Sequence, residues 1–389
     1  MLVMLDLSSA FDCIDVKMLV EDLKLLGVSG RALDWFQSYL TGRYFSVEIE
    51  DYTSNAASMD TGICQGTILA PLLFSIYCME LYFILRNLGI SCHFYADDTQ
   101  VLINVEDEEQ AQQEFNNVFN IVEEWMTRRK LKLNADKTEC IIFGNKPRLE
   151  ALEGFKYIQV KQDSKLTLAS QVKNLGVLFD QDLSMEPQIR SIKGKAIGHL
   201  TNISYIAKFI DRSSRLKLVY GLVLSRIDFC NSLYVGLPNN LLRSLQMIIN
   251  SSARLITGLP RFSRERITPV CMELHFLPIK ARIHYKICLL TFKALHYGQP
   301  SYLLEHLQCQ VPARTLRSTH SNRLVEPVIA QSSYSNRCFG FCAPRLYNSL
   351  PESVRLASSL SIFKTKLKTF MFEKAYDIST LSVKEEFIV

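Results

Sequence analysis

The feature that most constrains the fold is a long, almost wholly apolar run, Ile68–Leu85. A run of this length either crosses a membrane or forms a helix buried among other elements. Pro71 near its start and Glu80 inside it disfavour a membrane span, and the flanks do not follow the positive-inside pattern. Because proline is tolerated in the first turn of a helix, the sequence predicts a buried helix beginning near Pro71. The 389 residues suffice for two or three domains with cores of their own.

Strands and helices alternate around this helix. Strands are predicted over Met1–Leu5, Tyr44–Ile49, Ile90–Tyr95, Thr99–Asn104 and Thr138–Phe143. Helical spacing of apolar residues predicts three further helices. The first is capped by Asp15, has an apolar face that runs to Leu26, and is stopped by Gly27. The second ends at Gly42, and the third is a long helix over Asp107–Arg129. Short strands are expected over Phe155–Val177, and mainly helices after Pro187. This order predicts an α+β fold, in which helices pack on an antiparallel sheet.

Acidic residues stand at the ends of predicted strands. Asp6 ends the first strand, and Asp97 and Asp98 occupy the tip of a predicted hairpin. Magnesium prefers hard oxygen ligands such as carboxylates, and two close cations can promote a phosphoryl transfer. The residues alone leave a plainer interpretation open, in which Asp97-Asp98 is an ordinary acidic turn.

Charge is divided unevenly along the chain. Residues 1–150 contain 12 Lys+Arg and 23 Asp+Glu, whereas the remainder contains 32 and 16. An acidic first part could hold cations, and a basic second part could bind a polyanion, so the asymmetry favours nucleic acid as a partner.

The 11 cysteines form no Cys-x-x-Cys pair, and no secretory signal is visible. Both observations favour reduced thiols in an intracellular compartment, the nucleus or the cytoplasm, without a membrane segment. Cys309, His320, Cys338 and Cys342 are too scattered to predict a zinc site.

Five sequence blocks carry a family resemblance. Leu5-Asp6-Leu7-Ser8-Ser9-Ala10-Phe11-Asp12 resembles the first palm motif of reverse transcriptases from LINE-type (non-LTR) retrotransposons. Four further blocks resemble the next motifs in order: residues 61–74 (TGICQGTILAPLLF), residues 94–99 (FYADDT), residues 133–139 (LNADKTE) and residues 174–177 (NLGV). The segment 344–351 (PRLYNSLP) is similar to the C-terminal region of one branch of these elements. The resemblance is strongest over residues 1–180.

The resemblance implies a polymerase with a right-hand palm followed by a mainly α-helical thumb and a C-terminal region. The domains implied are a palm over 1–154, a palm–thumb connection over 155–185, a basic thumb over 186–310 and a C-terminal region over 311–389. Its partners would be an RNA template, a DNA primer and dNTPs.

The family also implies the roles of individual residues. Asp6, Asp97 and Asp98 would hold two Mg²⁺ ions, with Mn²⁺ as a substitute, and Lys137 would act on the departing pyrophosphate. Substrate would be contacted by Leu7, Phe11, Gln65, Gly66 and Tyr95, and the primer end by Leu175 and Gly176. From the residues alone, Phe11 could instead be a core aromatic after a strand, and a solvated surface lysine is an equal alternative for Lys137. Cys64 and Ala70 replace the family's usual proline and glycine, and Ala70 would be strained if its φ were positive.

The family's fingers and endonuclease would precede Met1, so a chain truncated there is expected to polymerise poorly by itself. The alternative function is a catalytically inactive nucleic-acid-binding remnant of such an element. A third interpretation is an unstable pseudogene product.

Overall fold

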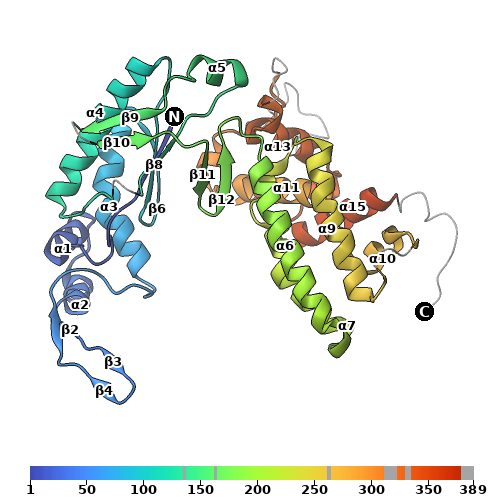
Figure 1. Ribbon diagram of the computed structural model, residues 1–389, viewed down its shortest axis with the longest axis horizontal. Helices are drawn as coiled ribbons and strands as arrows, with labels where there is room; N and C mark the ends of the chain where they lie inside the picture. The colour runs from blue at the N-terminus through green and yellow to red at the C-terminus, as the bar shows by residue number, and fades with distance from the viewer. Residues whose placement is uncertain (135–136, 162–163, 261–263, 311–321, 329–333, 378–389) are drawn as a thin grey trace. The chain divides into compact units, whose positions relative to one another are not determined.

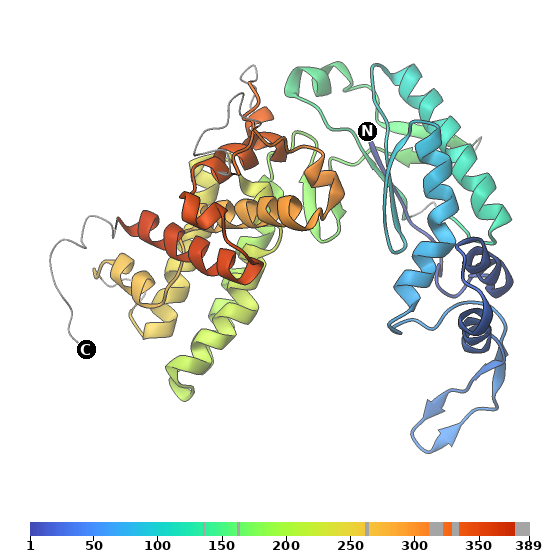
Figure 2. The same cartoon turned by 180° about the vertical axis from the view of Figure 1, so that it is seen from behind.

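The computed structural model describes residues 1–134, 137–161, 164–260, 264–310, 322–328 and 334–377 (Figure 1). The chain divides into two compact units, Met1–Leu183 and Ser184–Val389. The first mixes strands and helices, whereas the described part of the second has helices as its regular elements (Figure 2). The predicted α+β fold class is confirmed, in that the chain contains both helices and β-sheet.

A four-stranded antiparallel sheet forms the centre of the first unit. Its strands, in spatial order, are β6 (Ser91–Tyr95), β7 (Asp98–Leu102), β1 (Leu2–Leu5) and β8 (Glu139–Ile141). The predicted hairpin over residues 90–104 is therefore confirmed, and β1 lies between its second strand and β8. Leu5 pairs with Thr99 and Leu2 with Leu102.

The two faces of β1 contact different parts of the unit. Val3 and Leu5 belong to the large core that contains α3 and α4, whereas Leu2 packs with Ile141 and Val172 on the opposite face. Because β1 is buried on both faces, its sequence is continuously apolar rather than alternating.

The helices of the first unit are α1 (Val16–Leu25), α2 (Gly30–Leu40), α3 (Ala70–Asn87), α4 (Glu108–Arg128) and α5 (Lys146–Ala151). Four of them, α1 to α4, begin and end near the predicted positions, whereas α5 was not predicted. The Asp15 carboxylate accepts hydrogen bonds from the first turn of α1, as an N-cap does. The apolar run forms α3 with Pro71 in its first turn, and Ala70 has no positive φ. The strain considered for Ala70 is therefore absent.

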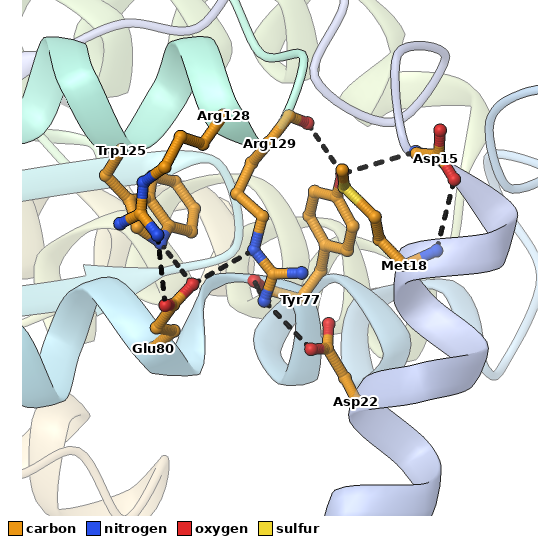
Figure 3. A network of polar contacts seen from close by, with 8 residues as sticks. All are labelled: Asp15, Met18, Asp22, Tyr77, Glu80, Trp125, Arg128 and Arg129. Carbon is orange, nitrogen blue, oxygen red and sulfur yellow. Dashed lines mark hydrogen bonds and ion pairs between the residues drawn. The ribbon is translucent and has the colours of Figure 1, made fainter.

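A polar network joins α1, α3 and the end of α4 (Figure 3). Arg129, with 11% of its side chain exposed, lies between two carboxylates: its Nη2 is 2.9 Å from Asp22 Oδ1, and its Nε is 3.2 Å from Glu80 Oε2. The Tyr77 hydroxyl donates to the Arg129 carbonyl at 2.6 Å, and Trp125 Nε1 donates to Glu80 at 2.9 Å. Burial raises the pKa of Tyr77 to about 12 and raises that of the Asp22 carboxyl.

Two predictions for the first unit are wrong. Tyr44–Ile49 is not one strand: β2 (Arg43–Phe45) pairs with β5 (Ala57–Met59), and β3 (Glu48–Ile49) pairs with β4 (Tyr52–Thr53). These ladders are largely exposed and are held by hydrogen bonds rather than by a core. Leu26 also lies outside the core: it is the C-cap residue of α1 and is 48% exposed.

Two further hairpins complete the first unit, as the short strands predicted over 155–177 suggested. β9 (Tyr157–Lys161) pairs with β10 (Ser164–Thr167), and β11 (Gln171–Asn174) pairs with β12 (Val177–Asp180). Ala169 donates a backbone hydrogen bond to Cys140 of β8, which attaches these hairpins to the central sheet.

The second unit is helical, as predicted. Its longer helices are α6 (Glu186–Ile206), α7 (Arg212–Val219), α9 (Asn239–Thr257), α11 (Ile279–Tyr297), α13 (Phe339–Asn348) and α15 (Leu360–Tyr376). Its shorter ones are η1 (Ala207–Phe209), η2 (Tyr220–Leu224), α8 (Ser225–Asp228), η3 (Asn231–Tyr234), α10 (Ile267–Glu273), α12 (Ser301–Leu304), η4 (Ser335–Arg337) and α14 (Glu352–Arg355). α11 packs against α13 and α15, where the rings of Phe292 and Phe363 stack with centroids 4.0 Å apart. Among the helices described here, none combines the length and the hydropathy of a membrane span.

Candidate active site

Strand pairing brings the three predicted metal ligands to one edge of the central sheet. Leu5 pairs with Thr99, so the next residue along β1, Asp6, lies beside Asp98 at the start of β7. Tyr95 pairs with Asp98, which leaves Ala96 and Asp97 as the two-residue turn of the hairpin. Ala96 has a φ of 52°, a conformation that L-residues seldom adopt and that is often found at functional sites.

The three carboxylates also interact electrostatically. Burial raises the pKa of Asp98, and the negative charges of Asp97 and Asp6 raise it further. Like charges gathered in this way are stabilised when a cation neutralises them, and oxygen donors suit Mg²⁺. The donor set therefore fits a divalent ion, although in the described part of the chain no three His, Cys, Asp or Glu side chains already stand in a metal-binding arrangement.

The backbone of Asp6 is fixed on its other side as well. Asn134 donates a hydrogen bond to the Asp6 carbonyl at 2.9 Å, and Leu7 forms a bridge with Leu133. Leu7 is itself only 7% exposed, so its predicted contact with substrate would have to come from its backbone. The block 133–139 thus lies directly beside the block 5–12, which contains Asp6. Residues 135 and 136 are outside the described structure.

Backbone hydrogen bonds join the loop at the start of the second block to the loop after Asp6. Gly62 donates to the Ile14 carbonyl at 2.8 Å and Ile63 donates to the Phe11 carbonyl at 2.9 Å. Gly62 has a φ of 78°, and a Cβ there would lie 2.8 Å from the Asp12 carbonyl oxygen, so only glycine fits. Arg43 Nη2 donates to the Gly62 carbonyl at 2.6 Å and holds the loop from the other side.

These hydrogen bonds hold the predicted substrate residue Phe11, in the block 5–12, near Gln65 and Gly66 in the block 61–74. Gln65 Nε2 donates to Asp12 Oδ1 at 3.4 Å. Gly66 has a φ of 80°, and nothing lies within 4 Å of the Cβ that it lacks, so its backbone faces open space. The half-buried ring of Phe11 packs on Phe74 of α3, with centroids 4.8 Å apart, which fixes its position.

Leu175 and Gly176, the predicted primer contacts, form the turn between β11 and β12. Both have positive φ, and the Leu175 side chain is 44% exposed. Asn174, just before the turn, exchanges two side-chain hydrogen bonds with Gln100 of β7, at 2.8 and 3.0 Å. The turn is thereby tied to the strand that begins with Asp98.

The other predicted side chains are accessible. Tyr95 is 66% exposed at the end of β6, and Lys137 is exposed in the turn that precedes β8. The sequence contains four residues that could be considered as zinc ligands, and no zinc site is predicted from them. Cys309 and Cys338 are exposed, Cys342 is buried, and His320 lies outside the described residues.

Sequence reasoning did not single out Gly62, Asp12 or Arg43. The first two stand inside the quoted blocks, so their place in the sequence was a usable signal. Arg43 lies between the blocks, and its role depends on a three-dimensional contact with the Gly62 carbonyl.

Comparisons with known proteins show what this chain is similar to. Residues 1–179 match the family described as reverse transcriptase (RNA-dependent DNA polymerase). The chain is 24% identical over 273 residues to the RNA-directed DNA polymerase from mobile element jockey of Drosophila funebris, covering 67% of this chain and 29% of that protein. It is 25% identical over 238 residues to the probable RNA-directed DNA polymerase from transposon X-element of Drosophila melanogaster, covering 59% of this chain and 25% of that protein.

The chain thus spans less than a third of the length of these relatives. A solved structure of telomerase from Candida albicans, in complex with a fragment of telomeric RNA, aligns with a TM-score of 0.40 and 12% identity, over 73% of this chain and 44% of that one. Residues 1–179 thus match a reverse transcriptase domain, and the relatives named above are RNA-directed DNA polymerases of mobile elements, in agreement with the resemblance to LINE-type (non-LTR) reverse transcriptases.

Proposed function

We propose that the first unit adds deoxynucleotides to a DNA primer on an RNA template, with Asp6, Asp97 and Asp98 holding two Mg²⁺ ions. The pairing of Leu5 with Thr99 carries the proposal, because it sets Asp6 beside the acidic tip of the hairpin. When bound, the ions would lower the pKa of the attacking hydroxyl and neutralise charge on the leaving oxygen. Mn²⁺ would substitute for Mg²⁺, because it accepts the same oxygen donors.

The neighbouring residues would orient the substrate. Phe11, held against Phe74, presents a rigid ring that would crowd a ribose 2′-hydroxyl and favour deoxynucleotides. Gln65 and the open backbone of Gly66 would lie against the nucleotide, and so would Tyr95 and the backbone of Leu7. Lys137, exposed near the same sheet edge, would neutralise the departing pyrophosphate.

The primer and the duplex would be held farther along the chain. The turn at Leu175 and Gly176 would seat the primer end, as the last part of a palm. The second unit would serve as the thumb, because Lys193, Lys195 and Lys217 are exposed on α6 and α7 and could contact phosphates.

Primer extension on an RNA template tests the proposal. Asp97→Asn keeps the size of the side chain but removes its charge, so incorporation of dNTPs should fall about 10²-fold or more. Asp34→Asn is the matched control, because Asp34 is exposed on α2, away from the sheet edge. Circular dichroism should be the same for all three proteins. Undiminished incorporation by Asp97→Asn would refute the assignment.

The exposed lysines of α6 and α7 also favour a second candidate, nucleic-acid binding without catalysis. It predicts that the unaltered chain binds primer–template with an affinity that falls as salt rises, yet incorporates nothing. That result would replace the polymerase proposal by the binding one.

A further inference from the structure

A small pocket in the second unit combines several cationic side chains with one carboxylate. Its volume is about 210 Å³, which leaves room for a small oxyanion together with water. Arg282 and Lys286 reach it from α11, and Lys368 reaches it from α15. Asp228, the last residue of α8, and Asn231, the first residue of η3, also line it.

Arg282 is held rigidly in this pocket. Its side chain is 10% exposed, its Nη1 lies 2.7 Å from Asp228 Oδ2, and its Nε donates to the Leu277 carbonyl at 2.8 Å. The Asp228 carboxylate therefore balances the guanidinium charge and fixes its plane, so little side-chain entropy remains to be lost when a ligand binds.

The two lysines leave the pocket with excess positive charge. Lys286 follows Arg282 by one helical turn, which sets both on the same face of α11. Neither Lys286 nor Lys368 has a carboxylate within ion-pair distance among the residues that the structure describes. Because the Asp228 carboxylate balances the charge of Arg282, the positive charges of Lys286 and Lys368 remain for a ligand to neutralise. Two such charges suit a dianion.

Asn231 adds a preference for a ligand that carries a proton. The residue is 1% exposed, and its Nδ2 donates to Asp228 Oδ1 at 3.3 Å. Its Oδ1 is buried and has no hydrogen-bond partner in the described part of the chain. An O–H donor from the ligand would satisfy this acceptor, whereas an anion without a proton would leave it unpaired.

The geometry points to a binding pocket for a phosphate group that retains an acidic proton: free hydrogen phosphate, which is a dianion with an O–H group, or a terminal phosphomonoester bound as its protonated, singly charged form. Internal phosphodiesters of nucleic acid are a poorer fit, because each has one negative charge and no O–H group. The pocket is therefore distinct from the general contacts with nucleic-acid phosphates proposed for α6 and α7, and it does not rest on polymerase activity.

Calorimetric titration of the full chain with inorganic phosphate and with sulfate tests the inference. Phosphate should bind measurably more tightly than sulfate. Lys286→Met and Lys368→Met should each weaken phosphate binding about tenfold, as expected for losing a charge-assisted hydrogen bond. The control Lys364→Met removes the same charge from α15 one turn away, at an exposed position outside the pocket, and should leave the affinity unchanged.

Three outcomes would overturn the inference: no phosphate binding by the unaltered chain, equal binding of sulfate, or equal losses in Lys364→Met and Lys368→Met. The last would mean that only net charge matters. Asp97→Asn should bind phosphate normally, which separates this pocket from the polymerase proposal.

Competition with short oligonucleotides would then identify the source of the phosphate group. If a 5′-phosphorylated strand displaces inorganic phosphate better than the same strand with a 5′-hydroxyl, the ligand is a terminal phosphomonoester. Equal displacement by the two strands assigns the pocket to free phosphate.

Discussion

The side-chain amides of Gln100 and Asn174 hydrogen-bond to each other in both directions, at 2.8 and 3.0 Å. Gln100 is buried in β7 two residues after Asp98, and Asn174 immediately precedes the turn at Leu175 and Gly176. A single amide pair thus joins the acidic strand to the turn proposed to seat the primer.

Breaking this pair should cost stability. Gln100→Leu leaves the Asn174 amide without its partner, so the free energy of unfolding should fall by about 1–3 kcal/mol. A double-mutant cycle with Asn174→Leu in urea unfolding should give a coupling energy of about 0.5 kcal/mol or more. Strictly additive effects would mean that the pair does not tie the turn to β7.

The two glycines of the second block should respond differently to alanine. Both have positive φ, so each substitution incurs backbone strain of about 1–2 kcal/mol. At Gly62 the added Cβ would also meet the Asp12 backbone at 2.8 Å, whereas at Gly66 it would meet nothing. Chemical unfolding should therefore show a larger loss in the free energy of unfolding for Gly62→Ala than for Gly66→Ala. Equal losses would contradict the close approach of Gly62 to the Asp12 backbone.

The raised pKa of Asp98 makes a small part of the stability depend on pH. In the folded protein Asp98 holds its proton to a higher pH than in the unfolded chain. Its contribution is therefore fully present below the unfolded pKa and is lost as pH rises through the folded one. Asp98 is largely exposed, so solvent screening keeps the effect small.

Nuclear magnetic resonance titration of the Asp98 carboxyl measures this shift directly. Asp97→Asn removes one of the neighbouring charges and should lower the pKa of Asp98. An unchanged pKa in that variant would show that the two carboxylates do not interact.

The network around Arg129 should tolerate the joint loss of two charges better than the loss of one. Arg129→Met leaves the buried carboxylate of Asp22 without its partner, which costs about 3–5 kcal/mol of unfolding free energy. Adding Asp22→Leu removes that carboxylate and should recover part of the loss in urea unfolding. A double variant as unstable as the sum of the two single ones would argue against the pairing.

Local patterns were sufficient to predict much of the first unit. The apolar run became α3, Asp15 capped α1, and the hairpin around Asp97 formed because alternating β-prone residues flank a tight turn. The motif blocks also contained the residues that converge at the sheet edge. These features depend on periodicity and on capping, both of which are encoded locally.

Other features depend on contacts between distant segments. Tyr44–Ile49 has the alternation of a strand, yet no core lies beneath it, and it forms parts of two exposed ladders instead. Leu7 looked available to substrate but is buried against its neighbours. The contact of Arg43 with Gly62, and the pairing of Arg129 with Asp22, join positions far apart in the sequence and have no local signal.

Binding of Mn²⁺ tests most directly whether the three carboxylates act as one metal site. Electron paramagnetic resonance of Mn²⁺, with primer–template and a non-incorporable dNTP present, should reveal two ions bound per chain. The triple variant with Asp6, Asp97 and Asp98 changed to Asn should lose both, while Asp34→Asn should lose neither. Equal Mn²⁺ binding by the triple variant and the unaltered chain would contradict the account.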